Sequence, residues 1–281
     1  MTDGNLLGRG QTAPVRGPLL VLGAGQRTGS TLLQRLLSSH PDVHIWGEHD
    51  GHIERMLTAA FWLRRWSETK GKLGRLEFAA GGYQSFMANL TPEASRVDNA
   101  MRQFLEVLYA DPALEMGRKV WGFKEVRYGQ PEAREIHRLF AETQVIHVIR
   151  DPRDMLRSLD AWERTLEHWQ RDDTLAAVGN WQRVTSSFLG SSQASTPPVL
   201  RLRYEDVVTD PAMTAARVGE FTGLDPGRFD MAVFARKIHD AGPGREGARH
   251  IRDWDELPES LRALLGDDRV QEAAAACGYL L

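Results

Sequence analysis

Short apolar runs alternate along the chain with stretches in which leucines recur at helical spacing. Five runs, PLLVLGAG, VHIWGE, KVWGFKE, QVIHVIR and VLRLRYEDVV, predict buried strands. After the first run, STLLQRLLSS has leucines at positions 32, 33, 36 and 37, which predicts an amphipathic helix that the following HPD ends. QVIHVIR is almost wholly apolar, as is typical of a parallel strand with helices on both faces.

Two Asp-Pro pairs mark further helix starts. The first opens DPRDMLRSLDAWERTLEHW, with Asp as the N-cap and Pro at the first helical position. The second opens TDPAMTAARVGEFTG, which closes on Gly, and the C-terminal stretch from DWDELPESL is also helical in pattern. Strands that alternate with helices predict an α/β fold, with a central parallel sheet flanked by helices.

Two segments depart from this alternation. Residues 1–17 are polar and contain Gly and Pro, which predicts a flexible N-terminal tail before a single domain over residues 18–281. Between Gly51 and Gly117 apolar and aromatic residues recur at helical spacing around the glycine-rich FAAGGYQSF. This pattern predicts a helical insertion over residues 51–117 and no separate domain.

Composition narrows the class of protein. The chain has 281 residues, 42% hydrophobic and 26% charged, and its net charge of -3 favours neither nucleic acid nor an anionic membrane. Its one cysteine, Cys277, excludes an internal disulfide and a multi-cysteine metal site. Without a signal-peptide core or a run of roughly 20 apolar residues, we expect a cytoplasmic protein. Abundant Arg and Ala with only five Lys indicate a GC-rich bacterial genome.

Ligands of open parallel sheets bind beyond the carboxyl ends of the strands, so the residues that follow each apolar run are candidates for a site. These are Gly23 to Thr31, Glu48, Lys124, Arg150, and Tyr204 with Glu205.

The first candidate, GAGQRTGST, offers backbone N–H groups and a helix N-terminus to an anion. Arg27 adds a positive charge, and Ser30 and Thr31 add hydroxyls. A P-loop for ATP would have Gly at Ala24 and Lys at Ser30, so this loop departs from that motif. The alternative is an ordinary strand-to-helix turn with Ser as its N-cap.

Glu48 and Lys124 each have a chemical and a structural interpretation. A carboxylate at Glu48 is placed to act as a general base, or else it pairs with a nearby Arg. Lys124 is placed to stabilise charge on a transferring group, or else it pairs with Glu125. A metal site from Glu48 and nearby histidines fits no zinc template, and surface positions are expected for His44, His49 and His52.

Arg150 ends the fourth apolar run, and Ser158 lies eight positions further along the next helix. Eight helical positions span about 12 Å, so both residues hold one group only if the start of that helix folds back. The alternative is a capped helix with surface charges.

Together these segments resemble the PAPS-dependent sulfotransferase family, most closely its tyrosylprotein and bacterial carbohydrate or small-molecule branches. The family's loop for the 5′-phosphosulfate, Pro-Lys/Arg-Ser-Gly-Thr/Ser-Thr, is similar to QRTGST. Arg27 takes the basic position, and Gln26 stands where the family has Pro. The resemblance assigns the whole loop to the nucleotide: Gln26, Arg27, Thr28, Gly29, Ser30 and Thr31.

Three other segments carry the resemblance. VIHVIRDPRDMLRSL is similar to the 3′-phosphate segment and assigns that group to Arg150 and Ser158. The Tyr-Glu-Asp segment assigns Tyr204 to the adenine, and SSHPDVHIWGE assigns the role of base to Glu48. The Arg-Lys-Gly clamp of cytosolic relatives is not evident, so Arg245 or Arg249 in GPGREGARHIRDW is taken to replace it.

The resemblance implies a P-loop-type nucleotide-binding fold and an O-sulfotransferase that uses PAPS, releases PAP and needs no metal. Glu48 would then be the base, and Lys124 and Arg27 would stabilise charge. A kinase that uses ATP and Mg²⁺, and a catalytically silent member that binds PAP or a partner, stay as alternatives.

The acceptor and the oligomeric state are left open, with a sugar, a lipid, a peptide tyrosine and a secondary metabolite all compatible with the sequence. The insertion would form an acceptor pocket or lid. Six aromatic residues either line that pocket or belong to the core: Trp62, Trp66, Tyr83, Phe86, Trp162 and Trp169.

Overall fold

The computed structural model describes residues 16–163, 171–190, 195–235, 257 and 259–281. Its centre is a five-stranded, fully parallel sheet in the order β2-β3-β1-β4-β5. The strands are β1 (Arg16–Gly23), β2 (Val43–Trp46), β3 (Val120–Glu125), β4 (Gln144–Ile149) and β5 (Val199–Arg203). The predicted α/β fold with a central parallel sheet is confirmed.

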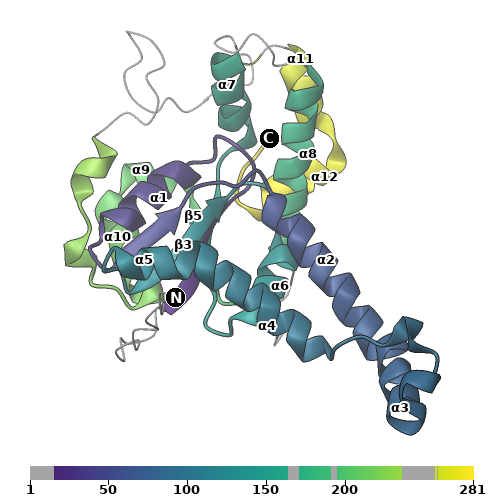
Figure 1. Ribbon diagram of the computed structural model, residues 1–281. Coiled ribbons are helices and arrows are strands. Elements are labelled where there is room, and N and C mark those ends of the chain that lie inside the picture. Colours follow the sequence, from purple (N-terminus) through teal and green to yellow (C-terminus); the bar gives the residue numbers. More distant parts are fainter. Residues whose placement is uncertain (1–15, 164–170, 191–194, 236–256, 258) are drawn as a thin grey trace.

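Helices cover both faces of the sheet (Figure 1). On one face, α1 (Ser30–Ser39), α9 (Tyr204–Thr209) and α10 (Pro211–Thr222) pack on alternate strand positions such as Leu19 and Val21. On the other face, α6 (Gln130–Leu139), α8 (Arg171–Ser187) and α12 (Asp268–Ala276) pack on the intervening positions, such as Leu20 and Leu22. This period of two is the alternation that the pleat of a strand imposes.

The predicted helix starts at the Asp-Pro pairs are confirmed. Helix α7 (Pro152–Glu163) begins after Asp151, whose carboxylate accepts the backbone N–H of Arg153 at 2.9 Å. The carboxylate of Asp210 caps α10 in the same way, through the N–H of Met213, and the helix ends at Gly223 with a φ of 70°. The C-terminal region is also helical, with α11 (Glu259–Arg262) and a 3₁₀ turn (Ala263–Gly266) before α12.

The predicted fifth strand is too long. VLRLRYEDVV was expected to be extended throughout, but β5 ends at Arg203 and Tyr204–Thr209 forms α9. Glu205 and Asp206 stand in the first turn of α9, where carboxylates interact favourably with the helix dipole. The chain therefore turns at Tyr204, at the carboxyl edge of the sheet.

Between β2 and β3 the chain forms a series of helices that projects from the sheet. Helix α2 (His52–Trp66) continues through a π-helical turn (Ser67–Gly71) into α3 (Lys72–Gly81), and short 3₁₀ turns (Gly82–Gln84, Met87–Asn89) follow. The chain returns along α4 (Ala94–Leu105), a second π-helical turn (Glu106–Ala110) and α5 (Asp111–Glu115). Figure 1 shows α2 and α4 running together away from the sheet, with α3 at their far end.

Four of the aromatic residues of this region lie outside the core. The alternative that Trp62, Trp66, Tyr83 and Phe86 are core residues is wrong, because between 46% and 81% of each is exposed. Of the other two aromatic candidates, Trp169 lies outside the described residues, and so does the side chain of Trp162. Among the helices that the structure describes, none is long and apolar enough to cross a membrane.

One polar side chain, that of His147, lies fully buried in β4. Its Nδ1 is 3.1 Å from the carbonyl oxygen of Leu22, and its ring lies 4.4 Å from that of Phe188. Burial lowers the pKa of His147 to about 4. The folded chain therefore keeps this ring neutral at pH values at which an exposed histidine is protonated.

This burial predicts a pH-dependent stability. Between pH 4 and about 6.5 the unfolded chain binds the additional proton, so acidification through this window lowers the free energy of unfolding. The loss approaches roughly 1.4 kcal/mol per pH unit within the window. Urea denaturation at several pH values should show a shallower slope for His147→Gln than for the wild type. The exposed His52→Gln serves as the control, and equal slopes in all three proteins would contradict the prediction.

Candidate functional site

The loop from Gly23 to Thr31 leaves the sheet at the end of β1 and turns back into α1. Gly25, Arg27 and Gly29 have positive φ values of 86°, 62° and 94°. The hydroxyl of the fully buried Thr28 donates to the carbonyl oxygen of Gly25 at 2.9 Å, which closes the turn. Such left-handed turns at a helix N-terminus direct backbone N–H groups into a concavity that suits an anion.

Gly29 is required at its position for two reasons. Its backbone is left-handed, and a Cβ placed there would overlap the ring of Tyr204 from α9. Gly29 is also the N-cap of α1 and supplies no side-chain cap, so the interpretation of Ser as the N-cap is wrong. Ser30 instead occupies the first helical position, where it is buried.

Arg27 connects the loop to the segment after β4. Its Nε donates to the hydroxyl of Ser158 on α7 at 3.0 Å, and its carbonyl oxygen accepts from Nη1 of Arg150 at 3.0 Å. Arg27 therefore contacts both Arg150, through its backbone, and Ser158, through its side chain. The guanidinium of Arg150 lies 4.3 Å above the ring of Tyr204.

Arg27 and Arg150 make the loop electropositive where it meets Tyr204 and the start of α7. Burial lowers the pKa of Arg27, and the positive charge of Arg150 lowers it further. Arg150 is itself only 8% exposed. Two guanidiniums held close together favour an anion at this point.

The segment that carries Arg150 is joined to the C-terminal end of the chain. The carboxylate of Glu205 on α9 accepts from the backbone N–H of Asp151 at 2.9 Å and from the hydroxyl of Tyr279 at 2.7 Å. Burial and the Glu205 charge raise the pKa of Tyr279, so its hydroxyl remains a donor. Arg203 covers the Tyr279 ring at 4.4 Å.

Lys124 and Glu48 meet at the other side of the loop. Lys124 is the last but one residue of β3 and lies within the strand, not beyond it. Its Nζ donates to the carboxylate of Glu48 and lies 3.3 Å from the hydroxyl of Thr31. The Lys124 side chain is 7% exposed and that of Glu48 is 33% exposed, so the carboxylate is the more accessible partner.

The alternative partner for Lys124, Glu125, is wrong. Successive side chains of a strand point to opposite faces, so Lys124 and Glu125 cannot share one environment. The fully buried carboxylate of Glu125 accepts the backbone N–H groups of Gly51 and Val126 at 2.9 and 2.8 Å and pairs with Arg127 at 3.0 Å. This carboxylate thereby joins the end of β3 to the start of α2.

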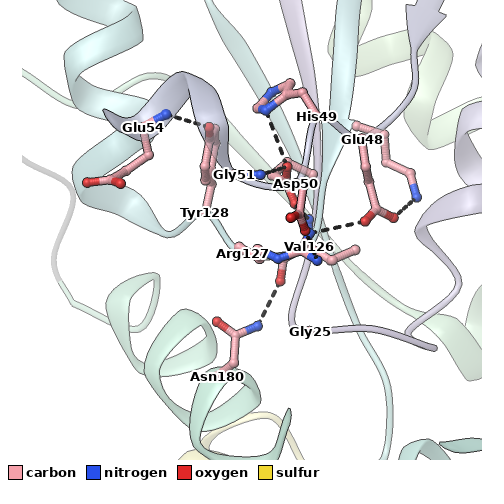
Figure 2. A network of polar contacts seen from close by, with 12 residues as sticks. Gly25, Glu48, His49, Asp50, Gly51, Glu54, Val126, Arg127, Tyr128 and Asn180 are labelled. Atoms are coloured by element: carbon pink, nitrogen blue, oxygen red, sulfur yellow. Dashed lines mark hydrogen bonds and ion pairs between the residues drawn. The ribbon is translucent and has the colours of Figure 1, made fainter. Parts of the chain in front are cut away.

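Arg127 was not anticipated from the sequence, and it connects three carboxylates. Figure 2 shows it between Glu48 and Asp50, with nitrogen–oxygen distances of 3.3 and 2.6 Å, in addition to its bond to Glu125. Together these carboxylates raise the pKa of Arg127, against the effect of its burial. A basic residue two positions after Glu125, directly beyond the strand end, was the available signal.

The histidines near Glu48 occupy different environments. His49 Nδ1 lies 3.5 Å from the Glu125 carboxylate, and burial lowers the pKa of His49. His44 packs edge-on against Trp46 at 4.2 Å, and burial lowers its pKa. His52 is exposed. Within the described ranges, no three His, Cys, Asp or Glu side chains gather closely enough to hold a metal ion.

The structure gives little on three of the nucleotide-binding candidates. Gln26 is partly buried in the loop. Arg245 and Arg249 lie outside the described residues.

The comparisons with known proteins all match sulfotransferases. A family model described as "Sulfotransferase family" matches residues 18–228. Protein-tyrosine sulfotransferase 1 of Danio rerio is 25% identical over 198 residues, which covers 69% of this chain and 50% of that protein. Protein-tyrosine sulfotransferase 1 of Homo sapiens is 26% identical over 170 residues, or 59% of this chain and 40% of that protein. The chain thus spans about half the length, or less, of these curated relatives.

Among solved structures, the "Sulfotransferase Domain from the Curacin Biosynthetic Pathway" matches with a TM-score of 0.51. It is 16% identical in sequence, and the match covers 96% of this chain and 100% of that structure. At this identity the likeness concerns the fold alone.

The contacts of Glu125 predict a large effect of Arg127 on stability. Arg127→Ala removes the guanidinium partner of a fully buried carboxylate, which retains its two backbone donors and the nearby ring of His49. We expect the free energy of unfolding to fall by about 2 kcal/mol, because the partly exposed guanidinium is screened in part by water. Lys119→Ala, which removes an exposed pair with Asp42, is the control and should cost under about 1 kcal/mol. Equal losses in urea denaturation would contradict the prediction.

Proposed function

Because this chain belongs to the sulfotransferase family, we propose that it is an O-sulfotransferase that uses PAPS, releases PAP and acts on a carbohydrate, natural product or other small molecule. One observation carries the proposal. The loop after β1 has an arginine pair at one side, where Arg150 Nη1 bonds the Arg27 carbonyl at 3.0 Å. At its other side Thr31 lies 3.3 Å from Lys124, which pairs with Glu48. The same loop thus lies beside two guanidinium groups suited to bind an anion and beside a carboxylate, that of Glu48, suited to accept a proton.

The nucleotide would occupy the arginine side. When bound, PAPS supplies an activated sulfuryl group next to its 5′-phosphate. The loop from Gln26 to Thr31 would hold the 5′-phosphosulfate through backbone N–H groups and hydroxyls. Arg150 and Ser158, which both contact Arg27, would hold the 3′-phosphate, and the Tyr204 ring would lie near the adenine. Arg245 and Arg249 are proposed as further 3′-phosphate contacts.

The acceptor would be activated at the other side. Glu48 would take the proton of the acceptor hydroxyl on a carboxylate oxygen. Lys124 and Arg27 would stabilise the negative charge that develops around the transferred group. Arg127 holds Glu48 by a bond of 3.3 Å from Nη1 to Oε2, so the carboxylate keeps one orientation. Positioning and electrostatics account for the chemistry, as in phosphoryl transfer.

We further propose that residues 18–281 form one sulfotransferase domain of a cytoplasmic bacterial enzyme. The helices of residues 51–117 would border the acceptor. Helix α2 starts at His52, four residues after Glu48, which supports this placement.

A binding experiment tests the nucleotide assignment. PAP should raise the unfolding midpoint of the protein, whereas ADP at equal concentration should raise it much less, because it lacks a 3′-phosphate. The PAP shift should persist without Mg²⁺ and should be lost in Arg150→Gln. Arg96→Gln, at an exposed position on α4, is the matched control and should keep it. A shift with ATP·Mg²⁺ alone would contradict the proposal and favour a kinase.

A kinetic experiment tests the proposed base. With PAPS and a simple phenol as acceptor, Glu48→Gln and Lys124→Met should each lower kcat by on the order of 10² or more. Glu48→Gln should leave the PAP shift unchanged, since Glu48 lies on the acceptor side. Glu54→Gln, on α2, replaces a carboxylate that bonds Thr58 and should retain the wild-type rate. PAP binding without turnover in the wild type would indicate a silent member.

A further inference from the structure

Helix α2 is apolar on two faces. Ile53, Leu57 and Ala60 face inward and are buried. Ala59, Trp62, Leu63 and Trp66 recur at i, i+3, i+4 and i+7, the spacing of a second apolar stripe, and all four are exposed. A helix that only packed against its neighbours would have a polar outer face, so the outer stripe calls for a partner.

Exposed apolar side chains continue over residues 62–87, which we call the tip. At 60% exposure for Trp62, 60% for Leu76 and 81% for Tyr83, these side chains extend largely into solvent. Leu63, Trp66 and Phe86 add to them. In Figure 1 this segment ends the projection formed by α2, α3 and α4, away from the sheet. Single exposed apolar residues are ordinary, but a gathering of this size marks an interaction surface.

The tip does not need these side chains to fold. Gly74 packs directly on the backbone of Asn89 and Leu90, where a Cβ would not fit. Arg75 Nη1 donates to the carbonyl oxygens of Thr91 and Pro92 at 2.8 and 3.1 Å, which joins α3 to the returning chain. Close backbone contact and one arginine therefore hold the tip, while its large apolar groups remain outside.

The tip is also positively charged. It contains five basic residues (Arg64, Arg65, Lys70, Lys72 and Arg75) and two acidic ones (Glu68 and Glu77), a formal net charge of +3. The Arg64 side chain is only 14% exposed and lies 3.9 and 3.8 Å from the carboxylates of Asp98 and Glu135, and Arg75 bonds backbone carbonyls. The basic side chains that face solvent are therefore those of Arg65, Lys70 and Lys72. The whole chain carries -3, so the remainder carries -6. From the net charge of -3 we expected no attraction to anionic membranes. That expectation applies to the chain as a whole, whereas this segment has the opposite sign of charge.

We propose that the tip docks on a membrane surface that carries anionic lipids. Trp, Tyr, Phe and Leu side chains partition into the interfacial region, and neighbouring Lys and Arg attract anionic headgroups. The tip combines both features on one helical projection. The strongly negative remainder is repelled by the same surface, so docking orients the molecule with its tip toward the lipid.

A second copy of the chain fits less well. A symmetric dimer through the tip would place the same surface on itself and bring +3 against +3. Contact between one tip and the negative body of another copy would be head-to-tail, and such contacts form open chains unless a ring closes. An anionic lipid surface satisfies the apolar groups and the charge together.

Vesicle binding of the full chain tests this proposal, independently of the proposed activity. In flotation assays the protein should bind phosphatidylcholine vesicles that contain phosphatidylglycerol and bind pure phosphatidylcholine at least roughly tenfold more weakly. Trp62→Ser/Trp66→Ser and Lys70→Gln/Lys72→Gln should each lower the partition coefficient by roughly tenfold or more. Added salt should weaken binding of the wild type more than that of the lysine variant.

Matched variants away from the tip serve as controls. Leu175→Ser/Met213→Ser removes two exposed apolar side chains, and Lys119→Gln/Arg228→Gln removes two exposed positive charges. Both should bind vesicles as the wild type does, and all variants should keep its circular dichroism. Equal binding to neutral vesicles, no binding, or unchanged binding by the tip variants would overturn the proposal. A dimer in sedimentation that Trp62→Ser/Trp66→Ser dissociates, without vesicle binding, would assign the tip to a second copy.

Discussion

The buried carboxylate of Glu125 is the constraint around which the candidate site is arranged. A fully buried charge at the end of a central strand must find donors, and Glu125 takes them from the start of α2, from its own neighbour and from Arg127. Arg127 reaches out from this buried point to Glu48 and Asp50. The accessible Glu48 carboxylate is therefore positioned by an ionic network that starts in the core.

The alternation of β3 divides the tasks of two adjacent residues. Lys124 points toward the loop after β1, where it meets Thr31 and Glu48, and Glu125 points to the opposite face and fastens the projecting helices. One short strand thus contributes a candidate site residue on one face and a structural anchor on the other. Both positions are buried, but they have different partners because successive side chains of a strand point to opposite faces.

Much of the fold could be predicted from the sequence, because the apolar runs and the Asp-Pro helix starts are local signals. The carboxyl ends of the strands also indicated which residues gather, since parallel strands bring those ends to one edge. Contacts between residues far apart in the sequence could not be predicted. Arg27 bonds Ser158, which is 131 positions away, and no local pattern encodes this contact. The left-handed backbone of Arg27 and the early end of β5 at Arg203 have no local sequence signal either. Arg127 was missed because its importance comes from the burial of Glu125.

The Glu205 carboxylate connects two segments that lie far apart along the chain. It joins the hydroxyl of Tyr279 to the backbone immediately after Arg150. The C-terminal end therefore helps to position Arg150, which is proposed to bind the 3′-phosphate. A disturbance of Tyr279 is therefore expected to reach the proposed phosphate-binding residues through Glu205, without any direct contact with the ligand.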